Sequence, residues 1–331
     1  MQARQITLAS RPVGMPTAET FGSRVVELAA PGEGEALVRW RFLSVDPYMR
    51  GRMNAAKSYV PPFEVGEALI GSAVGEVVES RSTGLEVGDL VLSMASWSDY
   101  EVKPAHSLRR LEPADGVSPS AYLGVLGMPG FTAYIGLTRF GEPKEGESLF
   151  VSGAAGAVGS AVGQIAKIMG LKVIGSAGGA AKSARLGELG FDVGIDYRAG
   201  DIVYLLAEAA PEGIDVYFDN VGGSHLVAAL EASRDYARFV MCGSISGYNA
   251  KAREPGPWNL FRVVQRRLTL RGFIVSDHGS AIGEFTEKMS GWIRSGQVKY
   301  DETVVHGLEN APEAFLGLFS GSNLGKMVVE L

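Results

Sequence analysis

One glycine-rich turn constrains the fold of this 331-residue chain more than any other feature. Residues 151–159 read VSGAAGAVG; they follow the apolar run ESLFVS and open a run of small residues with helical spacing. A tight turn between a strand and a helix is where a βαβ unit holds a dinucleotide pyrophosphate, because helix N-terminal amides attract anions. Ala154 replaces the first glycine of the usual G-x-G-x-x-G pattern. We expect Gly156 to admit the pyrophosphate, and Gly159 and Gly163 to allow close helix–strand packing.

Strands and helices alternate for more than a hundred residues around this turn. The strand-like runs are ESLFVS, LKVIGS, FDVGID, IDVYFDN, ARFVMCG and RRLTLRGFIV, with helical stretches between most of them. This alternation predicts a parallel, doubly wound sheet covered on both faces. Residues 24–112 instead read as short strands separated by Gly, Pro and Asp, which predicts a barrel-like β domain. We therefore expect an α/β protein with domains at 1–123 and 124–290 and a return to the first domain at 291–331.

Composition excludes several classes of protein. The single cysteine, Cys242, rules out an internal disulfide and any zinc site that needs two cysteine ligands. The net charge of −6 argues against duplex nucleic acid as a partner. No apolar run approaches the roughly 18 residues of a membrane span, and the first residues, MQARQITLASRPVG, lack a secretory apolar core. We expect a cytoplasmic protein that acts on a small molecule.

The segment that ends the second strand of the alternating region indicates which dinucleotide is bound. An NAD site usually carries Asp or Glu there, to hold the ribose 2′-hydroxyl. Here the segment reads VIGSAGG, without an acidic residue, and Lys182 follows at the start of the next helix. A carboxylate would repel a 2′-phosphate and a lysine would attract it, so NADP(H) is favoured over NAD(H). The alternative is that Lys182 is a solvated helix lysine.

Several motifs in order give the chain a family resemblance. They are VDPYMR at 45–50, LGMPGFTAY at 126–134, GAAGAVG at 153–159, GQIAK at 163–167, FDNVGG at 218–223, CGSISGYN at 242–249, RGFIV at 271–275 and NLGKMVVE at 323–330. The chain resembles the medium-chain dehydrogenase/reductase superfamily and is similar to its zinc-free leukotriene B4 dehydrogenase/prostaglandin reductase branch, which includes bacterial curcumin reductases. The resemblance covers nearly the whole chain and implies a GroES-like β-barrel domain, a Rossmann domain and a homodimer.

The resemblance also implies which residues contact NADP(H). The pyrophosphate would lie on Ala155, Gly156, Ala157 and Val158, and the 2′-phosphate on Lys182 and Tyr197. Asn220 would touch the cofactor, and Cys242, Gly243, Ser244, Ile245 and Tyr248 would line the nicotinamide ribose. Phe273, Ile274 and Val275 would meet the carboxamide through their backbone, and Asn323 would close over the cofactor. The chain departs from the branch at 276–278, which read Ser-Asp-His where relatives carry an aromatic and a basic residue.

Zinc-bearing relatives place a His-Glu pair in the early β domain. The corresponding stretch here reads Val65-Gly66-Glu67, with glycine in the histidine position. Together with the single cysteine, this predicts that no zinc is bound. Hydride transfer without a metal must rely on positioning and on hydrogen-bond donors.

Tyr248 is the best candidate for such a donor, because a phenol has a pKa of about 10 and keeps its proton at neutral pH. The alternatives are that Tyr248 only packs on the nicotinamide or orders its loop, with water or a ribose hydroxyl supplying the proton. Tyr48, Arg50 and Met128 are candidates to border the substrate, and a structural role is an equal alternative for each.

The sequence thus predicts an NADPH-dependent reductase of the C=C bond of α,β-unsaturated ketones or aldehydes. The first alternative is a quinone reductase of the same fold, which needs no proton donor near the β-carbon. The second is a non-catalytic NADPH-binding regulatory protein.

Overall fold

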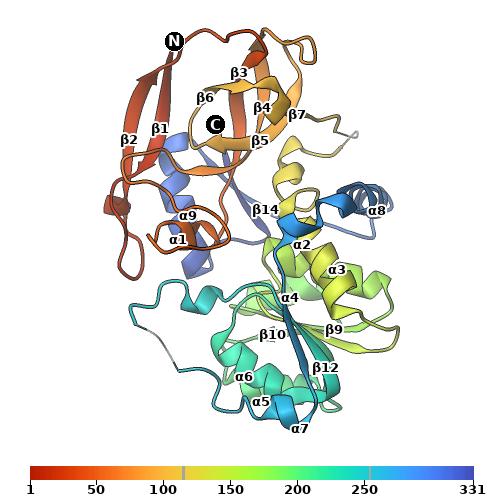
Figure 1. Ribbon diagram of the computed structural model, residues 1–331. Coiled ribbons are helices and arrows are strands. Elements are labelled where there is room, and N and C mark those ends of the chain that lie inside the picture. Colours follow the sequence, from red (N-terminus) through yellow and green to blue (C-terminus); the bar gives the residue numbers. More distant parts are fainter. Residues whose placement is uncertain (114–115, 253–254) are drawn as a thin grey trace. The chain divides into compact units, whose positions relative to one another are not determined.

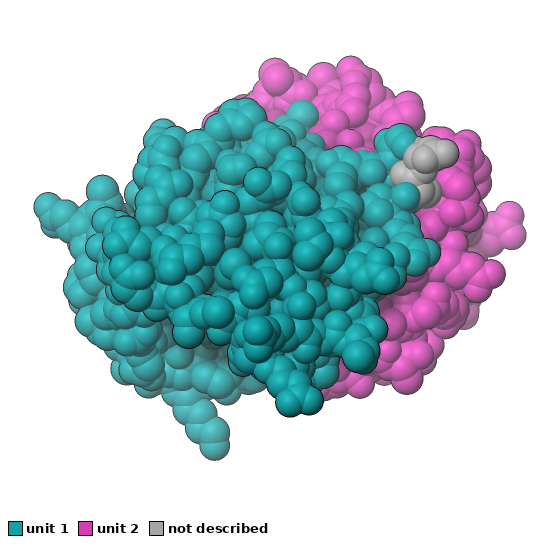
Figure 2. Space-filling model, turned by 90° about the horizontal axis from the view of Figure 1, so that it is seen from above, with its two compact units in different colours: residues 1–123, 302–331 teal, residues 124–301 magenta. Residues whose placement is uncertain are grey.

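The computed structural model describes residues 1–113, 116–252 and 255–331, which Figure 1 traces from the N-terminus to the C-terminus. These residues form two compact units, coloured separately in Figure 2: unit 1 comprises residues 1–123 and 302–331, and unit 2 comprises residues 124–301. The chain returns to unit 1 at Glu302 rather than at 291. The reason lies in two contacts within unit 2, where Asp301 pairs with Arg185 at 2.8 Å and the Lys299 carbonyl accepts from Gln164 at 2.9 Å.

Unit 2 is built on one parallel sheet of six strands (Figure 1). The strands are β8 (Ser148–Val151), β9 (Lys172–Ala177), β10 (Val193–Asp196), β11 (Ile214–Asp219), β12 (Ser233–Met241) and β13 (Thr269–Gly272). Their order is β10-β9-β8-β11-β12-β13, and every pair is parallel. From β8 the chain adds β9 and β10 on one side of the sheet, and from β11 it adds β12 and β13 on the other side. This confirms the predicted doubly wound fold, and it places the topological switch point between β8 and β11.

The helices of unit 2 bury an aromatic and aliphatic core. They are α2 (Met128–Ile135), α3 (Ala157–Ile168), α4 (Ala180–Glu188), α5 (Ile202–Ala209), α6 (Gly223–Ala232), α7 (Arg262–Gln265) and α8 (Ile282–Arg294). Helix α2 packs on α3, and α5 packs on α6. Phe150 stacks on Tyr217 with ring centroids 5.2 Å apart, and Phe239 meets Tyr217 edge-on at the same distance. Three neighbouring strands supply these rings, so the apolar strand sequences are explained by burial inside the sheet.

Unit 1 contains a mostly antiparallel sheet. Its strands are β3 (Glu35–Ser44), β4 (Ile70–Ser80), β5 (Leu90–Ser96), β6 (Tyr100–Pro104), β7 (Arg109–Arg110), β14 (Glu302–His306) and β15 (Lys326–Glu330). The order is β14-β15-β3-β4-β5-β7, and β6 pairs with the first half of β3. Strand β15 is antiparallel to β3. The closing LGKMVVEL segment therefore returns to the β domain, as expected.

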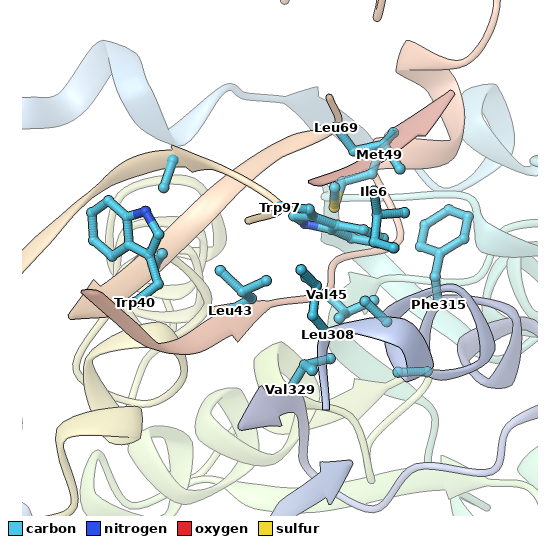
Figure 3. Close-up of a cluster of buried hydrophobic side chains, with 14 of the residues drawn as sticks. Ile6, Trp40, Leu43, Val45, Met49, Leu69, Trp97, Leu308, Phe315 and Val329 are labelled. Carbon is cyan, nitrogen blue, oxygen red and sulfur yellow. The ribbon is translucent and has the colours of Figure 1, made fainter. Parts of the chain in front are cut away.

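A separate pair of strands, β1 (Gln2–Leu8) and β2 (Phe21–Glu27), helps to close the core of unit 1. The backbone of Ile6 bonds to Trp97 at 2.9 Å and to Leu69 at 3.0 Å, so β1 lies against the ends of β4 and β5. Figure 3 shows the buried side chains that result, with Trp97 near Phe315 of α9 (Ala311–Ser320). Burying a ring such as Phe315 contributes about 2–3 kcal/mol.

A buried ion pair fixes the VDPYMR segment of unit 1. Lys326 donates to Asp46 at 3.2 Å and to the carbonyl of Val45 at 2.7 Å, and the Lys326 and Asp46 side chains are only 4% and 7% exposed. The pair ties the loop before α1 (Met49–Arg52) to strand β15. Two motifs that lie 280 residues apart in the sequence are thereby joined in one buried contact.

Within the residues described, none of the helices combines the length and the apolar character that crossing a membrane requires.

Candidate cofactor site

The turn between β8 and α3 has the geometry of a phosphate-binding turn. Gly153 adopts φ +61°, Gly156 is the N-cap of α3, and the amide of Ala154 donates to the Ser176 carbonyl of β9 at 2.8 Å. Ala155 is 94% buried, whereas Gly156, Ala157 and Val158 are half-buried. The first turn of a helix leaves amide groups without intrahelical acceptors. An anion at the N-terminus of α3 would be stabilised by these amides and by the helix dipole.

Close packing explains the next two glycines of the motif. A Cβ on Gly159 would lie 2.4 Å from the carbonyl oxygen of Gly153, and one on Gly163 would lie 1.9 Å from the ring of Phe191. Any side chain at either position would push α3 away from the turn or from the β9–β10 layer. The sequence-based expectation of close helix–strand packing is therefore correct.

The switch point between β8 and β11 is held by a buried carboxylate that the sequence analysis did not single out. Asp219 Oδ1 accepts hydrogen bonds from Tyr217 Oη at 2.7 Å, Ser152 Oγ at 3.1 Å, and the amides of Val221 and Gly222 at 2.9 and 2.8 Å. Burial raises the pKa of Asp219, and these hydrogen bonds oppose the rise. The carboxylate fixes the loop that follows β11.

Asn220 begins that loop. Its side chain donates to the Ser152 carbonyl at 2.8 Å, and its amide donates to Ser152 Oγ at 2.9 Å. These bonds join the carboxyl ends of β8 and β11, so Asn220 lies at the switch point predicted for it. Its contact with a cofactor stays a prediction.

The segment 242–248 follows β12 and is anchored to the same loop. The amides of Cys242 and Gly243 donate to the Asp219 carbonyl at 3.0 and 2.9 Å, and the amide of Ile245 donates to the Asn220 carbonyl at 3.2 Å. Burial and the Asp219 carboxylate raise the pKa of Cys242 to about 12. Its thiol therefore keeps its proton at neutral pH, in agreement with an inert thiol rather than a nucleophile.

Tyr248 folds back over this segment. A Cβ on Gly243 would lie 3.3 Å from Tyr248 Oη, and the Ser244 amide donates to the same oxygen at 3.5 Å. The hydroxyl is thus placed at the carboxyl end of β12, beside the loop that follows β11. This contact also supports the alternative in which Tyr248 orders its own loop.

The carboxyl ends of β9 and β10 form a corner with a cationic character. Lys182 lies in the first turn of α4, and Tyr197 and Arg198 follow β10. A Cβ on Gly178 would lie 2.7 Å from Tyr197 Oη and 3.0 Å from Arg198 Nε, so both groups cover this glycine. Burial, with a smaller contribution from the Arg198 cation, lowers the pKa of Lys182.

Asp196, the last residue of β10, is engaged by the backbone of this corner. Asp196 Oδ1 accepts from the amides of Gly179 at 2.8 Å and Arg198 at 3.0 Å. Its carboxylate therefore fixes the two loops of the corner. It does not stand at the end of β9, where an NAD site carries its acid.

The ring of Tyr197 packs against a buried histidine, His225. The two rings meet edge-on with centroids 5.1 Å apart, and His225 is only 4% exposed. Burial lowers the pKa of His225 to about 4, so the imidazole is neutral at pH 7. Tyr197 itself is 36% exposed, with its hydroxyl at Gly178.

The segment that follows β13 places Phe273, Ile274 and Val275 beside the end of β12. Phe273 stacks on Phe140 with centroids 4.9 Å apart, and its ring would contact any Cβ on Gly136 at 2.8 Å. The Phe273 side chain is therefore used in packing, which leaves its backbone for the predicted contact with a carboxamide. His278, in the segment that departs from the branch, meets Phe140 edge-on at 5.4 Å.

The remaining candidates have local structural roles. Met128 opens α2, and its carbonyl accepts from Thr132 at 2.7 Å. In unit 1, the buried Arg50 donates to the Gly14 carbonyl at 2.8 Å and to Asn54 at 2.9 Å. These contacts favour the structural alternative for Arg50.

Two further candidates lie in unit 1. Burial, with a smaller effect of Asp46, raises the pKa of Tyr48 to about 12, so its hydroxyl stays protonated. Asn323 donates to the Gly325 carbonyl at 2.8 Å just before β15. The substrate role of Tyr48 and the cofactor role of Asn323 stay predictions.

Within the described ranges, no three His, Cys, Asp or Glu side chains are grouped to hold a metal ion. Sequence reasoning did not single out Ser152, Gly178, Arg198 and Asp219, which the structure places at the switch point and at the corner after β9 and β10. Asp219 and Ser152 lie at the carboxyl ends of buried strands at the switch point. This position in the sequence pattern could have identified them. Arg198 directly follows Tyr197, but only the fold brings it to Gly178.

Comparison with known proteins agrees with this geometry. Residues 4–111 match a family described as "N-terminal domain of oxidoreductase", and residues 157–294 match "Zinc-binding dehydrogenase". The NADPH-dependent curcumin reductase of Escherichia coli is 46% identical over 99% of this chain and 96% of its own length. A 2-alkenal reductase (NADP(+)-dependent) of Nicotiana tabacum is 41% identical over 98% and 96%. Prostaglandin reductase 1 of Sus scrofa is 38% identical over 100% and 99%.

A solved structure extends the similarity to the fold. CurA of Vibrio vulnificus in complex with NADPH superposes with a TM-score of 0.94 at 46% identity, covering 99% of this chain and 98% of that chain. The chain therefore belongs to the medium-chain dehydrogenase/reductase superfamily, within the zinc-free branch that contains the curcumin, prostaglandin and 2-alkenal reductases.

Proposed function

We propose that this protein is an NADPH-dependent oxidoreductase that reduces the C=C bond of α,β-unsaturated ketones and aldehydes without zinc. The observation that carries the proposal is the corner of unit 2 where the Tyr197 hydroxyl covers Gly178 and where Lys182 lies close enough to Arg198 for that cation to lower its pKa, in addition to the larger effect of burial. The whole-length relatives named for curcumin, 2-alkenal and prostaglandin reduction support the same reaction class.

The donor set of unit 2 fits an adenine dinucleotide with a 2′-phosphate. The β8–α3 turn offers helix N-terminal amides for a pyrophosphate, and the absence of a side chain at Gly178 lets the Tyr197 hydroxyl lie close to the backbone after β9. A 2′-phosphate carries a charge of about −1.5 to −2 at neutral pH, which a lysine neutralises and a carboxylate would repel. In the proposed complex Lys182 and Tyr197 hold this phosphate.

When bound, the nicotinamide supplies the hydride for the β-carbon of the substrate. In the proposed reaction Tyr248 Oη donates a hydrogen bond to the substrate carbonyl oxygen, where negative charge develops. Such a donor contributes about 3 kcal/mol when it is aimed at the developing oxyanion. In its contact with the Ser244 amide the phenol is the acceptor, so that bond does not use the phenolic proton.

One experiment separates this function from the two alternatives. NADPH oxidation is followed with matched panels of enones, enals and quinones, and NADPH binding is measured separately by fluorescence. Turnover of enones and enals is expected. Turnover of quinones alone supports the quinone reductase, and binding without oxidation on any panel supports the regulatory protein.

The proposal includes a homodimer. Strand β13 is an outer strand of the parallel sheet, and Trp258 and Phe261, which precede it, are 78% and 66% exposed. An outer strand edge and exposed apolar side chains both suit pairing with a second chain. Light scattering coupled to size exclusion tests this; a mass of one chain contradicts it.

A further inference from the structure

Strand β11 ends in a buried carboxylate, that of Asp219, on which several hydrogen bonds converge. The residue is 0% exposed, and its Oδ1 accepts from Ser152 Oγ at 3.1 Å and from Tyr217 Oη at 2.7 Å. The same oxygen accepts from the amides of Val221 and Gly222 at 2.9 and 2.8 Å. A buried carboxylate is stable only when such donors replace water. Two side chains therefore hold the carboxylate, and the carboxylate holds two amides of the loop that follows β11.

This loop is bonded in turn to the segment 242–248, which follows β12. The carbonyls of Asp219, Asn220 and Val221 each accept at least one amide hydrogen bond from that segment, at distances from 2.9 to 3.2 Å. The Val221 carbonyl also accepts from Ser246 Oγ at 2.6 Å. Three successive carbonyls thus fix the course of the segment, and they belong to the loop whose amides bond to the Asp219 carboxylate.

The contact extends to the phenol of Tyr248. A Cβ on Gly222 would lie 2.3 Å from Ser244 Oγ, so the two segments touch without room for a side chain. The amide of Ser244 donates to Tyr248 Oη at 3.5 Å. Because the Gly222 amide is bonded to Asp219, a displacement of this glycine would shift Ser244 and, with it, the phenolic oxygen.

We propose that Asp219 is a positioning residue that acts through Tyr248: its carboxylate holds the loop after β11, and this loop holds the phenol in the orientation that donates to the substrate carbonyl. The inference rests on the proposed function. It gives Asp219 no contact with the cofactor or the substrate. It predicts that the carboxylate contributes to the rate of reduction only while the phenolic hydroxyl is present.

The test is a double-mutant cycle of Asp219→Asn and Tyr248→Phe. The asparagine keeps an acceptor oxygen at Oδ1 but loses the charge that makes such hydrogen bonds roughly twice as strong. Among the described residues none donates to Oδ2, where the new NH₂ group would lie. At saturating NADPH and enone, Asp219→Asn should lower kcat about tenfold when Tyr248 is present. In the Tyr248→Phe background it should change kcat by less than about twofold.

Tyr217→Phe is a milder second variant, which keeps the test decisive if Asp219→Asn does not fold. It removes one donor to Asp219 Oδ1 and keeps the buried ring. We expect kcat to fall about threefold, again only while Tyr248 is present. The matched control is Asp215→Asn, near the other end of β11, where the carboxylate accepts from the Ser148 amide at 2.9 Å. This control should lower stability in urea and leave kcat unchanged in both backgrounds.

Two outcomes overturn the inference: an unchanged kcat in Asp219→Asn, or an equal fall in the presence and absence of the Tyr248 hydroxyl. An equal fall would mean that Asp219 acts on the fold or on cofactor binding alone. The single variant Tyr248→Phe separates these failures from that of the proposed function. If it reduces enones as fast as the wild type, the proposed donor is wrong and the role of Asp219 falls with it. If it is slow and the effect of Asp219→Asn persists in it, only the role of Asp219 is wrong.

Discussion

Two parts of unit 2 face the same proposed cofactor, but they are built in different ways. The β8–α3 turn relies on backbone: small residues, a glycine with positive φ, and the N-terminus of a helix. The corner at the ends of β9 and β10 is instead made of side chains: Tyr197 and Arg198 cover Gly178, and Lys182 lies near Arg198. A backbone site requires small residues, because larger side chains would prevent an anion from reaching the main-chain amides. A side-chain site requires that the fold bring the right polar groups together.

This difference predicts different responses to substitution. In the turn, an added side chain should damage both the fold and the binding of either dinucleotide. In the corner, a changed side chain should leave the fold intact and alter only the choice between NADPH and NADH.

The largest effect is expected for Gly159→Val. The new Cβ would meet the carbonyl oxygen of Gly153 at 2.4 Å, and backbone cannot move aside as a flexible side chain can. We expect a loss of about 3 kcal/mol in the free energy of unfolding. Urea unfolding measures it. The matched control is Gly187→Ala in α4, where nothing lies within 4 Å of the added Cβ; a loss of the same size there would contradict the account of the turn.

Tyr248→Phe should lower kcat for enone reduction by about 100-fold without a large change in the NADPH Kd, because it removes one donor to a developing oxyanion. Steady-state kinetics and fluorescence titration separate the two quantities. Unchanged turnover would remove Tyr248 from the mechanism and leave it the role of ordering residues 243–244.

Lys182→Glu should raise the KM for NADPH about 30-fold more than the KM for NADH, because the new carboxylate repels the 2′-phosphate. Both values come from initial rates with one enone. Equal changes for the two dinucleotides would mean that the side-chain corner does not read the phosphate.

His225→Phe tests whether the histidine that packs against Tyr197 is buried as a neutral ring. The readout is the pH dependence of the free energy of unfolding. The pKa of His225 is about 4 in the folded protein and about 6.5 in an unfolded chain. Between these values the unfolded state binds more protons, so the free energy of unfolding falls as the pH drops from about 6.5 toward 4. The variant should lose about 2 kcal/mol less than the wild type between pH 7 and pH 5. Urea unfolding at the two pH values measures the difference; equal losses would mean that His225 is not buried as a neutral ring.

The smallest effect is expected for alkylation of Cys242. With a pKa of about 12, only roughly one thiol in ten thousand is ionised at pH 8. Iodoacetamide should leave mass and activity unchanged over an hour in the native protein and should label the urea-unfolded protein. Rapid native labelling would show that the segment 242–248 is open rather than packed on the Asp219 loop.

The same contrast between local patterns and distant contacts explains which features could be predicted from the sequence. Periodic apolar strands, the VSGAAGAVG turn and the late LGKMVVEL strand are local patterns, and the parallel sheet, the phosphate turn and the return of β15 to unit 1 all follow them. The early strand β1 was missed because its ARQITL pattern lies outside the stretch that reads as continuous strands.

The polar contacts were less predictable because they join distant segments. Ser152 and Asp219 are 67 residues apart and meet only because β8 and β11 are neighbours in the sheet. The pair of Asp46 and Lys326 depends likewise on β15 pairing with β3. Arg198 and Gly178 come together through the pairing of β9 and β10, which no spacing in the sequence encodes.

The central claim is that the protein delivers hydride from NADPH to a carbon of a conjugated double bond. The most direct measurement uses NADPH deuterated at the transferring position with an α,β-unsaturated ketone, followed by NMR and mass analysis of the product. The account predicts a saturated ketone with one deuterium at the β-carbon. An allylic alcohol with deuterium at the former carbonyl carbon, or a saturated product without deuterium, would contradict it.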